Sequence, residues 1–150
     1  MIKVLFVCHG NICRSPMAES VFTHLVKERG VQNQFEIASA ATSTEEIGNP
    51  PHSGTVQILA AFNIPLVPHR AVQMTPQDAL YYDYIIGMDS ANIRNIERIA
   101  GFKDKKICKL LSFAGSAADI ADPWYTGNFT QTYRSIKKGL DAFLRNLEMS

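Results

Sequence analysis

Short apolar runs alternate with helical patterns along the whole chain, and this alternation constrains the fold more than any other feature. Four runs have the length and composition of buried strands: residues 2–7, 35–40, 84–88 and 107–111. Apolar residues recur at helical spacing in the segments between and after them: residues 16–29, 53–62, 75–80, 90–99 and 129–147. Strands that alternate with helices predict a four-stranded parallel sheet with right-handed crossovers.

Composition and charge narrow the class of protein. A chain of 150 residues predicts one domain over residues 1–150 that needs no disulfide or structural metal to fold. Its 15 basic and 14 acidic residues give no global field for nucleic acid or an anionic membrane. The N-terminal apolar run is too short for a signal peptide or a membrane span. Three cysteines suit a reducing compartment, so we expect a cytoplasmic protein.

The segment from Cys8 to Pro16 combines a thiol, a fixed cation and the start of a helix. A strand that ends near Cys8 and a helix that opens near Ser15 leave about five backbone N–H groups free to converge on a phosphate. The positive end of the helix dipole lies behind them. Such surroundings favour the thiolate, which is the nucleophilic form of cysteine. Residues 8–15, the anion loop, therefore predict an anion site with a nucleophile.

The anion loop matches C-x5-R-[ST], the signature of cysteine-dependent phosphatases, and the string CHGNICRSPMAE at residues 8–19 resembles the low-molecular-weight protein tyrosine phosphatases. The likeness extends from the loop at the N-terminus to a late Asp122-Pro123 motif. It implies a flavodoxin-like three-layer α/β sandwich and a metal-independent enzyme without cofactors. Its substrates would be phosphotyrosine proteins and small aryl phosphates, hydrolysed through a phosphocysteine. Phosphate, vanadate or arsenate would occupy the same loop.

Phosphoryl transfer needs a nucleophile, neutralisation of the oxygens and a proton for the leaving group. We assign these roles to Cys8, to Arg14, which can grip two oxygens in a bidentate contact, and to Asp122 as general acid. A buried structural cysteine and an Asp-Pro turn are the bland interpretations of Cys8 and Asp122. The spacing of the anion loop argues against both. The other loop residues are His9, Gly10, Asn11, Ile12, Cys13 and Ser15.

Several residues are expected to support the loop or to shape the pocket. Ser15 is a candidate N-cap, and Asn11 tolerates a left-handed backbone. The resemblance further implies that Ser15 donates toward Cys8 and that Asn11 bonds to Ser39 and His69. Trp124 and Tyr125 are the expected aromatic walls of the pocket. The third expected wall residue is Glu45, which stands where relatives commonly carry a tryptophan on the pocket lip.

Cys13 lies five residues from Cys8 on a curled loop, so the two sulfurs could come within disulfide reach and form a redox-protected pair. A packed loop cysteine is nearly as good an interpretation of Cys13. A zinc site at Cys8, His9 and Cys13 is disfavoured, because no second ligand pair has zinc spacing and Arg14 would repel a cation.

Three alternative functions remain open on this sequence. Arsenate reductases with this loop need a further cysteine pair, whereas only Cys108 remains here. Arginine phosphatases resemble the chain but carry threonine at the position of Ile12, whose bulk suits an aryl ring. A non-catalytic phosphate-binding module would have little reason to keep both Cys8 and Asp122.

Overall fold

Four parallel strands form the sheet of the computed structural model, which describes residues 1–148. The strands are β1 (Ile2–Cys8), β2 (Phe35–Ala41), β3 (Tyr84–Gly87) and β4 (Ile107–Lys109). They lie in the order β2-β1-β3-β4, and every pair is parallel. This is the flavodoxin-like order, in which the chain reverses direction across the sheet between β1 and β3. The predicted fold class is confirmed.

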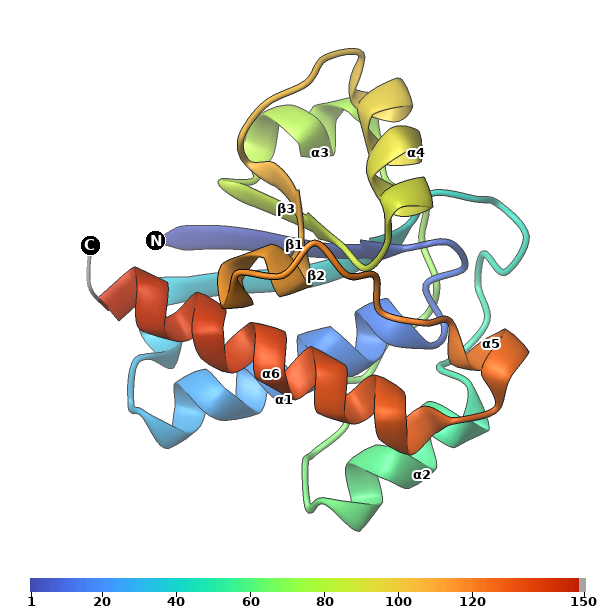
Figure 1. The fold of residues 1–150 in the computed structure, drawn as a ribbon, viewed down its shortest axis with the longest axis vertical. Coiled ribbons are helices and arrows are strands. Elements are labelled where there is room, and N and C mark those ends of the chain that lie inside the picture. Colours follow the sequence, from blue (N-terminus) through green and yellow to red (C-terminus); the bar gives the residue numbers. More distant parts are fainter. Residues whose placement is uncertain (149–150) are drawn as a thin grey trace.

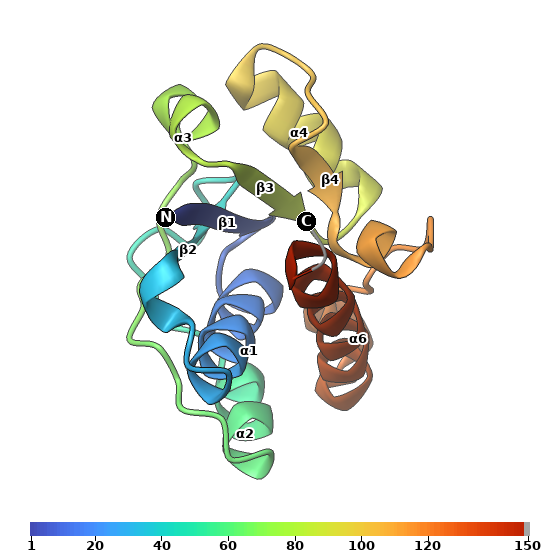
Figure 2. The same cartoon turned by 90° about the vertical axis from the view of Figure 1, so that its left-hand side faces the viewer.

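Helices cover both faces of the sheet, as Figures 1 and 2 show. On one face lie α1 (Arg14–Glu28), α2 (Ser53–Ala61) and α6 (Phe129–Glu148), and on the other lie α3 (Pro76–Tyr81) and α4 (Ser90–Ala100). The shorter pieces are α5 (Pro123–Thr126) and the 3₁₀ turns η1 (Gln32–Gln34) and η2 (Leu110–Ala114). None of the helices in residues 1–148 combines the length and the hydropathy that crossing a bilayer requires.

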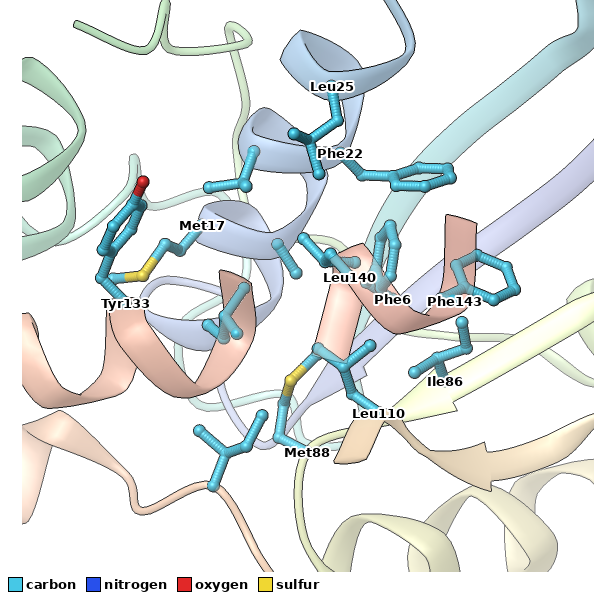
Figure 3. Packing of buried hydrophobic residues seen from close by; sticks show 14 of the residues in the cluster. Phe6, Met17, Phe22, Leu25, Ile86, Met88, Leu110, Tyr133, Leu140 and Phe143 are labelled. Atoms are coloured by element: carbon cyan, nitrogen blue, oxygen red, sulfur yellow. The ribbon is translucent and has the colours of Figure 1, made fainter. Parts of the chain in front are cut away.

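Strand β1 supplies both halves of the core because its side chains alternate between the two faces. Val4 and Phe6 pack with α1 and α6, while Leu5 and Val7 face α3 and α4. The first half is rich in aromatic rings and is seen from close by in Figure 3. Phe22 of α1 is its centre: its ring lies 5.8 Å from that of Phe6 and 5.3 Å from that of Phe143.

The structure corrects the predicted extent of one strand. The apolar run at residues 107–111 continues as a strand only to Lys109, after which η2 begins. Leu110 and Leu111 are buried, and Leu110 packs against α6 at Gly139, where an added Cβ would come within 2.6 Å of the Leu110 side chain. A buried 3₁₀ turn and a buried strand present the same apolar run, so the sequence could not separate them.

Helix starts agree more closely with the sequence patterns. Thr75 forms a capping box with Asp78 at the start of α3, and Asn128 accepts a hydrogen bond from the backbone N–H of Gln131 at the start of α6. At α1 the prediction was wrong. The helix begins at Arg14, the N-cap position belongs to Cys13, and Ser15 lies inside the first turn.

Candidate active site

The candidate site lies at the edge of the sheet where the parallel strands end. Cys8 is the last residue of β1, and residues 9–13 curl from it to the start of α1 (Figure 1). The chain that leaves β2 is bonded to the same loop: the backbone N–H of Thr42 donates to the Cys8 carbonyl, and that of Ser43 donates to the His9 carbonyl, both at 3.0 Å. The anion loop therefore lies at the topological switch point between β1 and β3, as expected for ligand sites in such sheets.

Cys8 is buried, and Ser15 faces its sulfur with two polar groups. The Ser15 hydroxyl oxygen lies 3.0 Å from Cys8 Sγ, and the Ser15 backbone N–H donates to the same sulfur at 3.4 Å. Ser15 lies in the first turn of α1, and its side chain turns toward the thiol and does not cap the helix. Donors at these distances stabilise negative charge on sulfur.

Asn11 ties the loop to its surroundings from an unusual backbone conformation. Its φ of +59° lies in the left-handed region, which asparagine tolerates better than most residues. The Asn11 amide donates to the hydroxyls of Ser15 at 2.7 Å and Ser39 at 3.1 Å. Its carbonyl oxygen accepts from Val72 N–H and lies 2.6 Å from His69 Nε2. The hydrogen bonds that the family resemblance implies for Asn11 are therefore present.

Glu19 extends this network and was missed by the sequence analysis. It is buried on α1, accepts a hydrogen bond from the Ser39 hydroxyl at 2.5 Å, and lies 3.7 Å from His69 Nδ1. Burial raises the pKa of the Glu19 carboxyl despite the bond from Ser39. Burial also lowers the pKa of His69, against the effect of its bond to Asn11. The sequence held one signal for its burial: Glu19 has the same helical spacing as the apolar core positions of α1.

Arg14 is the largest buried polar side chain near Cys8, with 2% of its surface exposed. Its Nη1 donates to Asp89 Oδ2 at 2.7 Å and to the Ile120 carbonyl at 2.8 Å, and its Nη2 donates to Asp122 Oδ2 at 3.4 Å. Within residues 1–148 its Nε, although buried, has no hydrogen-bond partner. A buried guanidinium N–H that has no partner and lies at the N-terminus of a helix is a donor suited to an anion.

The charges around Arg14 keep it cationic. Burial alone would lower the pKa of the guanidinium, but the nearby Cys8, the hydrogen bond and charge of Asp89, and Asp122 raise it. Asp89 was not predicted as a site residue. It directly follows the third apolar run, and the ends of parallel strands meet at one edge, so its place could have been read from the sequence.

These residues surround a pocket of about 100 Å³. Every predicted catalytic residue lines it, and so do all predicted wall residues and most of the anion loop: Cys8, His9, Gly10, Ile12, Cys13, Arg14, Glu45, Asp122, Trp124 and Tyr125. Asn11, Ser15, Ser39 and His69 lie outside the lining and form the hydrogen-bonded support. Glu46 also lines the pocket and was not predicted.

Asp122 has two contacts at the pocket wall. One carboxylate oxygen accepts from the backbone N–H of Trp124 at 3.0 Å, so Asp122 caps the short helix α5, and the other faces Arg14. The turn interpretation of Asp-Pro is thus correct as local structure, and it also brings the carboxylate into the pocket. Beside it Trp124 and Tyr125 are 56% and 83% exposed, which leaves their rings available for an apolar ligand.

The lip opposite α5 carries acidic side chains. His9 Nε2 lies 3.0 Å from Glu45 Oε2, and both groups are largely exposed. Glu46 accepts a hydrogen bond from Asn49 and stays in the pocket lining. Among residues 1–148, no three His, Cys, Asp or Glu side chains gather as metal ligands would.

Cys13 is buried in the same pocket but in different surroundings from Cys8. Burial raises the pKa of the Cys13 thiol to about 12, and the nearby Cys8, Asp122 and Glu46 add to the effect while Arg14 opposes it. All three cysteines are free thiols in the structure.

Comparisons with known proteins agree with this geometry. Residues 3–150 match the family model described as low molecular weight phosphotyrosine protein phosphatase. The chain is 43% identical over 151 residues to the low molecular weight protein-tyrosine-phosphatase YfkJ of Bacillus subtilis, and the match covers 99% of this chain and 97% of that protein.

Solved structures match over nearly the whole chain as well. The crystal structure of YfkJ from Bacillus subtilis superposes with a TM-score of 0.94 at 42% identity, and covers 99% of this chain and 96% of that one. A drosophila arginine phosphatase superposes with a TM-score of 0.87 at 31% identity, and covers 97% and 98% of the two chains.

The unequal surroundings of the two pocket cysteines predict selective alkylation. With a pKa of about 12, only about one Cys13 thiol in 10⁵ is ionised at pH 7. Iodoacetamide should therefore modify Cys8 well before Cys13, by tenfold or more in rate, as followed by peptide mass spectrometry. After unfolding in guanidinium chloride, Cys8, Cys13 and Cys108 should react alike. Faster modification of Cys13 in the folded protein would contradict this assignment.

Proposed function

The chain belongs to the low molecular weight phosphotyrosine protein phosphatase family, and from that membership we propose that it hydrolyses phosphotyrosine in proteins through a phosphocysteine at Cys8. The observation that carries the proposal is the pairing of a buried Cys8 thiol with the buried Arg14 guanidinium at one pocket. The unpartnered Arg14 Nε and the backbone N–H groups of the anion loop supply donors for the phosphoryl oxygens.

In the first step Cys8 Sγ attacks phosphorus and the bond from phosphorus to the tyrosyl oxygen breaks. Arg14 and the anion loop neutralise the charge on the three equatorial oxygens. Asp122 gives its proton to the departing oxygen and becomes a carboxylate. The incoming phosphoryl group competes with Asp122 for Arg14 Nη2, a contact that at 3.4 Å is the longest of the three that Arg14 makes.

In the second step a water molecule attacks the phosphocysteine. Asp122, now a carboxylate, takes a proton from the water as its oxygen bonds to phosphorus, and the bond from sulfur to phosphorus breaks. The Cys8 thiolate and inorganic phosphate result. Ser15, which faces the sulfur at 3.0 Å, stabilises the thiolate as leaving group.

The pocket walls support an aryl phosphate as substrate. Trp124 and Tyr125 offer flat rings on one side, and Ile12 offers an apolar side chain within the loop. Glu45 and Glu46 at the lip disfavour peptides with acidic residues close to the phosphotyrosine. Phosphoarginine is the second candidate substrate, since a structural relative at 31% identity is an arginine phosphatase.

Cytoplasmic action and redox control complete the proposal. A reducing compartment would keep the three free thiols in the form that the structure has. Oxidation of Cys8 by peroxide gives a sulfenic acid and water, and attack by Cys13 then gives a disulfide and a second water.

Substrate choice is tested with matched phosphopeptides. The wild type should hydrolyse a phosphotyrosine peptide with kcat/KM about tenfold or more above that for the phosphoarginine peptide, and Cys8→Ser should lose turnover on both. Ile12→Thr should lower the ratio of kcat/KM for the phosphotyrosine peptide to kcat/KM for the phosphoarginine peptide. Val56→Thr on the exposed face of α2 should leave that ratio unchanged. A wild-type preference for phosphoarginine would refute the assignment of substrate.

Asp122 is tested through the leaving group. Asp122→Asn should lower kcat/KM for phenyl phosphate on the order of 10²–10⁴-fold, because its basic leaving group needs the proton, and much less for p-nitrophenyl phosphate. Asp119→Asn is the control: Asp119 bonds to Ser90 and Lys109 outside the pocket, so it should lower stability without changing the dependence on leaving group. Equal slopes for Asp122→Asn and wild type would leave Asp122 with a structural role.

The redox proposal predicts reversible inactivation. Mild peroxide should link Cys8 to Cys13, as mapped by mass spectrometry, and a thiol reductant should restore activity. In Cys13→Ser the recovery should fall, because Cys8 then proceeds to sulfinic acid. Full recovery in that variant, or a Cys8–Cys108 bond, would exclude Cys13 as the partner.

A further inference from the structure

The segment at residues 120–129, which carries Asp122, is anchored firmly at its start. The Ile120 backbone N–H donates to the Met88 carbonyl at 2.9 Å, and the Ile120 carbonyl accepts from Arg14. Beyond this point the chain turns outward through α5, whose residues Trp124 and Tyr125 are exposed. The carboxylate of Asp122 thus lies on a stretch that depends on other contacts for its distance from the anion loop.

His52 supplies such contacts from the start of α2. Its ring stacks on Phe129 with centroids 5.1 Å apart and an interplanar angle of 21°, and it meets Trp124 edge to face at 5.6 Å and 82°. These two aromatic residues flank the outward turn, one just after Asp122 and one at the start of α6. The starts of α2 and α6 and the short helix α5 lie close together in Figure 1.

His52 is itself held to the anion loop. Its backbone N–H donates to the Ile12 carbonyl at 2.8 Å, and its Nδ1 accepts from the Gly54 backbone N–H at 2.9 Å as the N-cap of α2. The acceptor role at Nδ1 fixes the ring plane. Phe129 lies so close to this helix start that a Cβ on Gly54 would come within 2.5 Å of its ring. His52 therefore connects the loop that holds the phosphate to the segment that holds Asp122.

We infer that His52 is a positioning residue for acid catalysis: its ring, clamped between Trp124 and Phe129, sets the place of Asp122 over the anion loop. Trp124 transmits the position, because its backbone N–H donates to Asp122 Oδ1 at 3.0 Å. Displacing the Trp124 ring moves this donor and with it the carboxylate. The inference rests on the proposed role of Asp122 and adds a residue that contacts neither the phosphoryl group nor the leaving oxygen.

The test separates the ring of His52 from its role as helix cap. His52→Asn keeps a side-chain acceptor for the Gly54 N–H, since asparagine is among the best N-caps, and removes the ring. Phe62→Leu is the matched control: it deletes another stacked pair between the α2 and α6 regions, that of Phe62 with Tyr133 at 4.2 Å, away from the pocket. For each variant kcat/KM is measured on phenyl phosphate and p-nitrophenyl phosphate, together with the thermal midpoint.

His52→Asn should lower kcat/KM on the order of tenfold for phenyl phosphate and less than about threefold for p-nitrophenyl phosphate, since a small displacement of the acid matters most for the basic leaving group. Phe62→Leu should shift the thermal midpoint without separating the two substrates. Equal losses on both substrates, or wild-type rates, for His52→Asn would overturn the inference. The proposed function stands without the inference if Asp122→Asn, in the same assay, loses far more activity on phenyl phosphate than on p-nitrophenyl phosphate.

Discussion

A full positive charge buried beside Cys8 is the constraint that organises this end of the molecule. Arg14 is withdrawn from solvent, so its charge needs partners inside the protein. Removing one partner of a buried ion pair costs about 3–5 kcal/mol of folding stability, because the remaining charge is left buried and uncompensated. The three partners of Arg14 come from two distant stretches: Asp89 follows β3, and the Ile120 carbonyl and Asp122 precede α5. The guanidinium thereby fixes the start of α1, the end of β3 and the chain before α5 relative to one another. The guanidinium N–H that these partners leave unpaired is a donor suited to an anion.

The sequence predicted the parts of the site that lie in one contiguous stretch or at the end of a strand. The sequence placed Cys8 at the end of the first strand and Arg14 beside the start of the following helix, and the left-handed tolerance of Asn11 matched its observed backbone. Local rules failed where tertiary packing decided. Ser15 is a good capping residue, yet α1 begins at Arg14, which puts Ser15 inside the first turn, where its hydroxyl meets Cys8 Sγ.

Other residues escaped because their signals are not local. Glu19 shares the helical spacing of the apolar core positions of α1, but that spacing does not show that its carboxyl lies beside His69. Glu46 reaches the pocket only because the chain after β2 folds back along the anion loop. His52 carries no motif, and its contacts join segments that lie more than seventy residues apart. Residues 41–51 bring Glu45 and Glu46 to the pocket and residues 111–128 bring Asp122, and only the structure shows which of their side chains reach it.

The base and the rim of the pocket differ in how well they tolerate substitution. Its base is a web of buried hydrogen bonds around Asn11, Ser15 and Ser39, in which each member has a partner that a substitution would strand. Its rim consists of exposed side chains on the segment after β2 and on α5, such as Glu45 and Tyr125. Rim residues can therefore be exchanged by mutation at little cost to folding. A lineage of such proteins, or a protein engineer, can redirect recognition at the surface while inheriting the same reactive centre unaltered.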